Sequence, residues 1–270
     1  MSEQEIINDR SIEVRTYFVR GRNALVARGD FSQIYVDYYL HLADYGLQVK
    51  SDAAEYVKSA LAAITLHCAS RPRTERIAWT VNFQSPLLNV FAAGDNPAGT
   101  VVATVFTENV KVAEHGLFFS DTVRGADAPR RSVVDFSGPG FFQAAERYYQ
   151  HSEQRPGRFF NFTDDDFVLV GGQPDCDVEW LLALDEAGVR GLDQNEELSL
   201  LEQRYYRFEC GCTQDRMMRV LESVFKQDPE GLFGDDPSIR ISCPRCSAKY
   251  LITREAMEAH AEIARRQSEV

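Results

Sequence analysis

Apolar residues repeat with two different periods in the N-terminal part of the chain. They alternate with polar residues across 11–28, on both sides of a turn at 21–23, and this predicts two strands joined by a hairpin. They recur every three or four positions across 31–42 and 51–68, and this predicts two helices with one buried face each. Ser51 is expected to cap the second helix.

Short strand patterns dominate the middle of the chain. Segments rich in β-branched and aromatic residues follow one another at 77–83, 87–93, 100–106, 117–123 and 132–136. Because no helical pattern separates them, they favour a largely antiparallel sheet. A helix after residue 140 and a hairpin across 159–170 complete a predicted α+β domain, residues 1–173, which ends at a Gly-Gly-Gln-Pro turn.

Residues 174–203 form a strongly acidic segment. From Asp175 to Glu202, nine carboxylates face Arg190 alone, so the stretch carries a net charge of −8 out of −12 for the chain. Its apolar residues have spacings that predict amphipathic helices, namely Val178, Leu181, Leu182, Leu192, Leu198 and Leu201. Because like charges repel, such helices need a neighbouring surface to be stable. The sequence therefore predicts a linker that docks on another part of the protein.

Two pairs of cysteines stand out near the C-terminus, Cys210 with Cys212 and Cys243 with Cys246. Each pair lies on a short turn, and two such turns supply the four thiolates that a tetrahedral zinc site takes. We therefore expect these four residues to bind one Zn²⁺ per chain. Four small apolar residues in a core are the alternative, which this spacing disfavours.

Residues 204–270 are predicted to form a small module around these thiols. A helix at 215–227 is expected to turn five apolar side chains inward, namely Met217, Met218, Leu221, Val224 and Phe225. Strands at 239–242 and 250–252 flank the second cysteine pair, and a charged helix starts at Thr253.

The other two cysteines have no partner at ligand spacing. Cys68 lies on the apolar face of the second predicted helix, so it is expected to be buried and inert. The neighbouring His67 is expected to be hydrogen-bonded or exposed rather than a ligand. Cys176, at the start of the acidic segment, is also interpreted as a non-ligand.

Charge and composition exclude several classes of function. A net charge of −12 opposes nucleic-acid binding, which needs clustered Lys and Arg. No apolar run approaches the ~18 residues of a membrane span. The polar residues Met1–Glu5 do not open a secretory signal, so a cytoplasmic protein is expected. Thiols stay reduced there, and paired cysteines then indicate metal or redox chemistry.

Together, the mixed N-terminal domain, the acidic segment and the two cysteine pairs resemble the redox-regulated bacterial holdase family called the 33 kDa chaperonin. Residues 148–156 add to the resemblance, because a Ser-Glu-Gln triplet near a helix end precedes a proline there. Residues 91–95 are similar to the family's central strand and turn.

The resemblance implies a chaperone that is idle while four thiolates hold zinc. Oxidants would then form the disulfides Cys210–Cys212 and Cys243–Cys246, release zinc, and unfold the linker and the module. The active form would bind unfolded or misfolded client proteins during oxidative stress, and it would be a homodimer. The N-terminal domain would act as the chaperone core.

Two other classes of function stay open at this stage. A zinc-ribbon binding or adaptor protein would use a purely structural zinc site, helped by Arg204, Arg207, Arg216 and Arg219. A thiol oxidoreductase would use Cys243-Pro244-Arg245-Cys246, but this motif lies outside any βαβ pattern. Because the chain also has no nucleophile elbow, phosphate loop or dinucleotide motif, we predict that it is not an enzyme.

Overall fold

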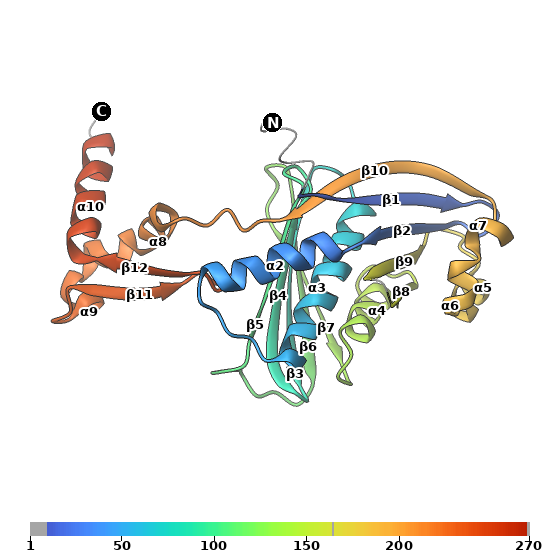
Figure 1. The fold of residues 1–270 in the computed structure, drawn as a ribbon, viewed down its shortest axis with the longest axis horizontal. Coiled ribbons are helices and arrows are strands. Elements are labelled where there is room, and N and C mark those ends of the chain that lie inside the picture. Colours follow the sequence, from blue (N-terminus) through green and yellow to red (C-terminus); the bar gives the residue numbers. More distant parts are fainter. Residues whose placement is uncertain (1–9, 164, 269–270) are drawn as a thin grey trace. The chain divides into compact units, whose positions relative to one another are not determined.

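The computed structural model describes residues 10–163 and 165–268, so the predictions for Met1–Glu5 lie outside it (Figure 1). Two units are present. Unit 1 contains the chain up to Leu40 together with Gln48–Glu209, and unit 2 contains His41–Leu47 together with the chain from Cys210. Along the chain, the last boundary between them lies just before the first cysteine pair.

Within the described residues, unit 1 is built on one ten-stranded sheet of order β7-β6-β3-β4-β5-β10-β1-β2-β9-β8. In chain order the strands are β1 (Ile12–Val19), β2 (Ala24–Asp30), β3 (Glu75–Gln84), β4 (Leu87–Asp95), β5 (Thr100–Phe106), β6 (Gly116–Arg124), β7 (Arg130–Phe136), β8 (Gly157–Asn161), β9 (Asp166–Gly172) and β10 (Leu198–Phe208). Neighbours are antiparallel except β5 and β10, which pair in parallel at Arg207–Thr100 and Phe208–Val101. The α+β class and the largely antiparallel sheet are confirmed.

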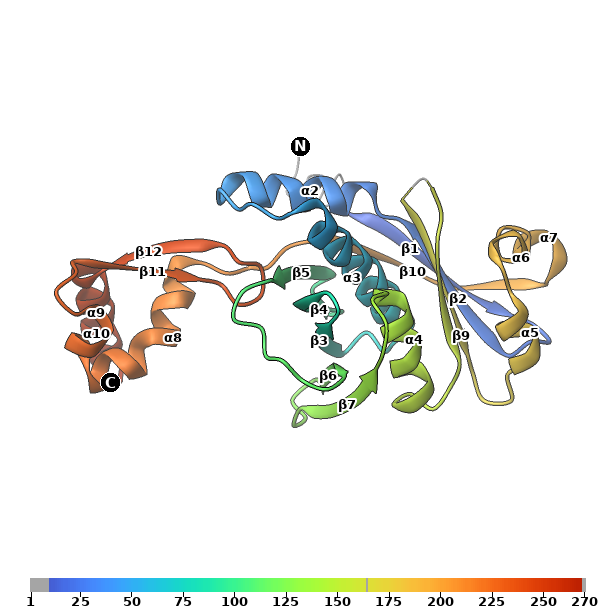
Figure 2. The same cartoon turned by 90° about the horizontal axis from the view of Figure 1, so that it is seen from below.

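Two helices, α3 (Ser51–Ala69) and α4 (Phe141–His151), cover the inner face of this sheet (Figure 2). Helix α3 contacts β4 and β5 of one half and β2 and β9 of the other. Helix α4 contacts β7 and β8, the two end strands, so the sheet curves around both helices. This curvature places the core of unit 1 between the halves of the sheet.

The predicted helices are present, with small differences at their ends. Val57, Leu61 and Cys68 are fully buried on α3, as their spacing predicts. The predicted cap is wrong, because Lys50 holds the N-cap position without a side-chain hydrogen bond and Ser51 already lies in the helix. The first predicted helix is α2 (Ser32–Asp44), whose last residues belong to unit 2.

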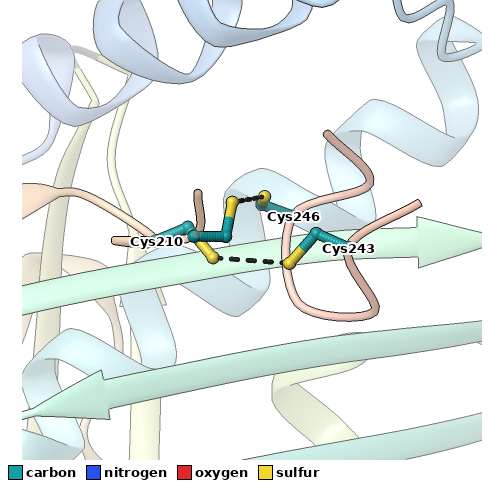
Figure 3. Close-up of side chains that lie close together, drawn as sticks. Cys210, Cys243 and Cys246 are labelled. Carbon is teal, nitrogen blue, oxygen red and sulfur yellow. Dashed lines mark hydrogen bonds between the residues drawn. The ribbon is translucent and has the colours of Figure 1, made fainter. Parts of the chain in front are cut away.

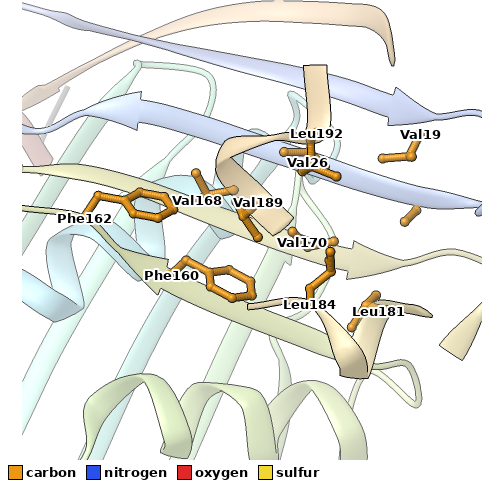
Figure 4. Close-up of a cluster of buried hydrophobic side chains, with 11 residues drawn as sticks. Val19, Val26, Phe160, Phe162, Val168, Val170, Leu181, Leu184, Val189 and Leu192 are labelled. Carbon is orange, nitrogen blue, oxygen red and sulfur yellow. The ribbon is translucent and has the colours of Figure 1, made fainter. Parts of the chain in front are cut away.

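The acidic segment folds onto unit 1 through three short helices, α5 (Val178–Ala183), α6 (Glu186–Arg190) and α7 (Leu192–Asn195). The helices and the link between α5 and α6 bury four apolar side chains against β2, β8 and β9, namely Leu181, Leu184, Val189 and Leu192 (Figure 4). Leu198 and Leu201 were expected on a helix, and this is wrong because both lie in strand β10. Strand β1 offers β10 an antiparallel partner from Ile12 to Val19, and this pairing overrides the local helical spacing.

Unit 2 contains α8 (Gln214–Gln227), α9 (Pro229–Phe233), the hairpin β11 (Ser238–Ser242) and β12 (Lys249–Thr253), and α10 (Arg254–Ser268). Its small core is made by Phe225, Phe233, Ile252, Met257 and Ala261. Met217, Met218 and Leu221 are partly buried against this core.

The prediction that Val224 points inward is wrong, since 48% of it is exposed. Neighbouring helix positions lie about 100° apart around the axis, and the narrow core contacts only the stripe centred on Leu221 and Phe225.

Among the described helices of both units, none is long and apolar enough to cross a bilayer.

Candidate metal centre

The four paired cysteines come together at one point of unit 2. Cys210 and Cys212 follow strand β10, and Cys243 and Cys246 lie on the turn between β11 and β12. All four sulfur atoms lie within 4.8 Å of one another (Figure 3). The structure therefore unites the four residues that the sequence spacing predicted as ligands.

The arrangement of the sulfurs matches what a metal ion needs. A tetrahedral site with metal–sulfur bonds of about 2.3 Å has sulfur–sulfur edges of about 3.8 Å. The sulfurs of Cys210 and Cys243 are 3.7 Å apart, and those of Cys212 and Cys246 are 3.4 Å apart. Because Cys243 and Cys246 are buried and the other two are half-buried, the site is closed like a structural one. The four residues could hold one metal ion.

Local backbone geometry holds each pair in place. The amide of Cys243 donates to the carbonyl of Ala248 at 2.8 Å, and the amide of Ser247 donates to the carbonyl of Cys243 at 2.8 Å. These bonds close the turn that carries the second pair. Between the first pair, Gly211 has φ +65°, and its carbonyl accepts a hydrogen bond from Arg216 of α8. Glycine suits this position because it adopts positive φ without steric cost.

The thiols influence one another's protonation. Hydrogen bonds from Cys210 and Cys246 lower the pKa of Cys243, and the backbone amides of Arg245 and Cys246 act in the same direction. The hydrogen bond with Cys243 raises the pKa of Cys210 to about 12. Negative charge therefore collects first at Cys243, where backbone amides stabilise it.

A second layer of side chains surrounds the sulfurs. The Tyr250 hydroxyl lies 3.1 Å from both the carbonyl oxygen and the sulfur of Cys212. The Nε2 atom of His41 lies 2.9 Å from the carbonyl oxygen of Cys246, and since a carbonyl only accepts, Nε2 must carry the proton. Tyr45 contacts Tyr250, with their hydroxyls 3.5 Å apart. Such outer contacts orient metal ligands.

Sequence reasoning missed this second layer. Tyr250 has a weak signal, because it stands four residues after Cys246 on a predicted strand. His41 and Tyr45 are separated from the cysteines by more than half of the chain, so no local pattern indicates their role.

A cavity of about 510 Å³ opens beside the thiols. Its lining includes Cys210, Cys212, Cys243 and three arginines, Arg216, Arg219 and Arg245. Of the arginines that the sequence suggested for an adaptor, Arg204, Arg207 and Arg219 form ion pairs with Glu202, Glu209 and Asp215.

The remaining cysteines belong to unit 1. Cys68 is fully buried in α3, and burial raises the pKa of its thiol to about 12, so it stays protonated. The neighbouring His67 shares a hydrogen bond with Tyr149, whose hydroxyl lies 2.7 Å from the imidazole Nδ1. This confirms that the imidazole is hydrogen-bonded. Cys176 packs against the buried face of the acidic segment, and burial raises its pKa as well.

Comparisons with known proteins agree with this architecture. Residues 172–253 match the family model described as Hsp33 protein. The 33 kDa chaperonin of Caldanaerobacter subterraneus is 32% identical over 65 residues, which cover 24% of this chain and 22% of the relative. The 33 kDa chaperonin of Edwardsiella ictaluri is 28% identical over 155 residues, which cover 48% of this chain and 53% of the relative. The chain thus spans about half, or less, of the curated relatives that it matches.

The fold has a solved counterpart. The crystal structure of the 33 kDa chaperonin from Thermotoga maritima matches with a TM-score of 0.70 and 14% identity, and it covers 94% of this chain and 98% of that one. Fold and site thus define a class, an α+β domain followed by a small unit with a four-cysteine cluster. Within that class, the chain resembles the 33 kDa chaperonins, and its residues 172–253 match the Hsp33 family model.

Proposed function

We propose that this protein is a redox-regulated cytoplasmic chaperone, a holdase that binds unfolded or misfolded proteins during oxidative stress. The observation that carries the proposal is the four-sulfur cluster, which joins two distant turns of a unit with a very small core. In the reduced state, Cys210, Cys212, Cys243 and Cys246 would hold one Zn²⁺, the ion that such a sulfur set prefers.

The size of unit 2 makes its folding depend on the metal. Its two segments together have fewer than the ~70–80 residues below which a core alone rarely suffices. Structural zinc contributes an apparent ~10–16 kcal/mol in small zinc-finger peptides, which is comparable to the whole stability of a typical domain at ~5–15 kcal/mol. Losing the metal should therefore unfold unit 2.

Oxidation supplies the trigger. Two thiolates and one hydrogen peroxide give one disulfide and two hydroxide ions, so the two pairs use two peroxide molecules and give up four electrons. A disulfide sulfur no longer offers the thiolate that binds the metal. Following the family resemblance, we assign the disulfides Cys210–Cys212 and Cys243–Cys246. They close very small loops, so they constrain an unfolded unit poorly.

The proposed client surface lies in the acidic segment, residues 174–203. The segment leads into strand β10, which ends at Phe208 just before Cys210, so unfolding of unit 2 would remove the folded unit that follows that strand. Leu182, Leu200 and Leu201 are already more than half exposed, and Leu181 and Leu192 would join them if the segment detached. Leucines among carboxylates give a surface that can hold apolar chains and stay dissolved. The proposed protein thus has three parts, a chaperone core at 1–173, an acidic client-binding segment at 174–203 and a zinc-binding module at 204–270.

The test compares reduced and oxidised protein. Zinc content is measured before and after peroxide with a chromogenic chelator, and suppression of a client's aggregation is followed by light scattering. We expect one zinc per reduced chain, its release on oxidation, and suppression by the oxidised form alone. Sedimentation of the same samples tests the expected homodimer. Equal suppression by both forms would contradict the proposal.

A second candidate is an adaptor with a purely structural zinc site, which the arginine-lined cavity beside the thiols favours. It predicts that peroxide leaves the zinc bound. A salt-dependent gel shift tests for a nucleic-acid partner, which the net charge of −12 opposes. Turnover in an insulin-reduction assay would instead indicate an oxidoreductase, a catalytic role that the proposed chaperone does not have.

A further inference from the structure

We infer that the Tyr250 hydroxyl is a positioning group that restrains the reactivity of the Cys212 sulfur. The inference rests on the proposed redox function, because it assigns one residue that sets how readily the first cysteine pair reacts. Tyr250 is not itself a ligand in this assignment. It acts through the sulfur that it contacts.

The contact is specific in its geometry. The hydroxyl oxygen of Tyr250 lies 3.1 Å from the sulfur of Cys212 and 3.1 Å from its carbonyl oxygen. The single hydroxyl proton can reach either acceptor, and a sulfur that carries the negative charge of a thiolate attracts it more strongly than a neutral carbonyl. The neighbouring Tyr45 hydroxyl, 3.5 Å away, is placed to support the Tyr250 oxygen.

The other sulfurs have different surroundings in the described part of the chain. Cys243 receives backbone amides from Arg245 and Cys246, and Cys246 receives the amide of Ala248. Backbone amides cannot be removed by a side-chain substitution, whereas the Tyr250 hydroxyl can. The hydrogen bonding of the Cys212 sulfur can therefore be changed by a substitution at one position, Tyr250.

The chemical consequence follows from charge. A thiolate attacks a peroxide or an alkylating reagent with its lone pair, and a hydrogen bond to that sulfur draws electron density away from it. Cys212 also lines the 510 Å³ cavity, so small reagents can approach it. Removing the hydroxyl should leave the sulfur equally accessible but more nucleophilic.

The substitution Tyr250→Phe isolates the hydroxyl. Tyr250 lies in strand β12 opposite Ile241 of β11, and the ring and the strand pairing stay the same in the variant. Tyr205→Phe is the matched control, because Tyr205 is 54% exposed and belongs to strand β10 of unit 1, whereas the thiols belong to unit 2.

The experiment measures alkylation of each cysteine in the zinc-loaded protein. Samples are treated with iodoacetamide, quenched at intervals and analysed by mass spectrometry. We expect Tyr250→Phe to raise the alkylation rate of Cys212 about three- to tenfold, from the strength of a charged hydrogen bond and the usual dependence of thiol reactivity on charge. Cys246 serves as the internal reference, and Tyr205→Phe should change neither rate.

A second variant tests the same idea in the opposite direction. Replacing Tyr250 with 3-fluorotyrosine keeps the hydroxyl and makes it a stronger donor, so alkylation of Cys212 should slow. An unchanged or slower rate in Tyr250→Phe would overturn the inference, as would spontaneous zinc loss from that variant, which would indicate a structural role. If the natural protein keeps its zinc in peroxide, the proposed function fails, while the alkylation rates still decide the role of Tyr250.

Discussion

At the scale of single residues, a buried imidazole lies among the aromatic side chains of unit 1. The Nδ1 atom of His67 is 2.7 Å from the Tyr149 hydroxyl, and its ring packs on Trp79 with centroids 4.9 Å apart. Burial lowers the pKa of His67 well below its usual range, and Arg71 and Arg155 lower it further. His67 is therefore neutral in the folded protein.

This neutrality makes unit 1 sensitive to acid. The unfolded chain protonates His67 near its ordinary pKa of 6.5, while the folded protein does not, so stability is complete above that pH and is lost as the pH falls. Between the pKa of His67 in the folded protein and its pKa in the unfolded chain, the free energy of unfolding changes by about 1.4 kcal/mol per pH unit. We expect His67→Gln to remove this slope in urea unfolding followed by tryptophan fluorescence. The control His115→Gln, at a half-exposed site, should keep it, and equal slopes in all three proteins would refute the expectation.

Residue spacing predicted the thiol cluster because two short turns constrain where their sulfurs can lie. It could not predict the contacts of His41 and Tyr250, because these depend on how distant segments pack. It also placed Val224 in the core, since spacing shows which face is apolar but not how wide the opposing surface is.

At the scale of elements, the acidic segment depends on a few apolar contacts for its position. Leu181, Leu184, Val189 and Leu192 are buried on the sheet, while most of the carboxylates around them face solvent. Ion pairs such as Arg22 with Asp177 add contacts at the surface, where they stabilise weakly. The leucine side chains therefore supply most of the docking.

Two adjacent leucines allow a matched comparison. Leu181 is fully buried and Leu182 is 60% exposed, so Leu181→Ala should destabilise the segment by about 2–5 kcal/mol and Leu182→Ala by less than about 0.5 kcal/mol. Hydrogen exchange of the α5–α7 amides measures the difference. If the segment also binds clients, Leu181→Ala should suppress aggregation even when reduced. Equal hydrogen exchange in both variants would show that the buried apolar side chains do not fix the acidic segment on the sheet.

Local periodicity predicted most helices and strands, since those elements bury one face at a regular spacing. Strand β10 escaped prediction because its partner β1 lies near the other end of the chain, with Ile12 opposite Tyr206. The sequence also could not show that the acidic segment packs on unit 1 and is not part of unit 2. That assignment depends on tertiary contacts, which a single sequence does not display.

At the scale of the whole molecule, the chain combines one large core with one small unit, which under the proposed function depends on a bound metal ion. Unit 1 keeps an extensive buried core around α3 and the sheet, while the core of unit 2 rests on five buried side chains. We therefore expect a chelator to unfold unit 2 and leave the sheet of unit 1 intact. The proposed switch extends this unfolding to residues 174–203.

The most direct measurement is hydrogen exchange along the full chain, read by mass spectrometry with zinc release recorded in the same sample. After peroxide, the proposed switch predicts that protection falls in residues 210–268 and in 174–203 as zinc leaves, while β3, β4 and α3 stay protected. A reductant with added zinc should restore both. Full protection of 174–203 after complete zinc release would contradict the central claim that the four thiols control the acidic segment.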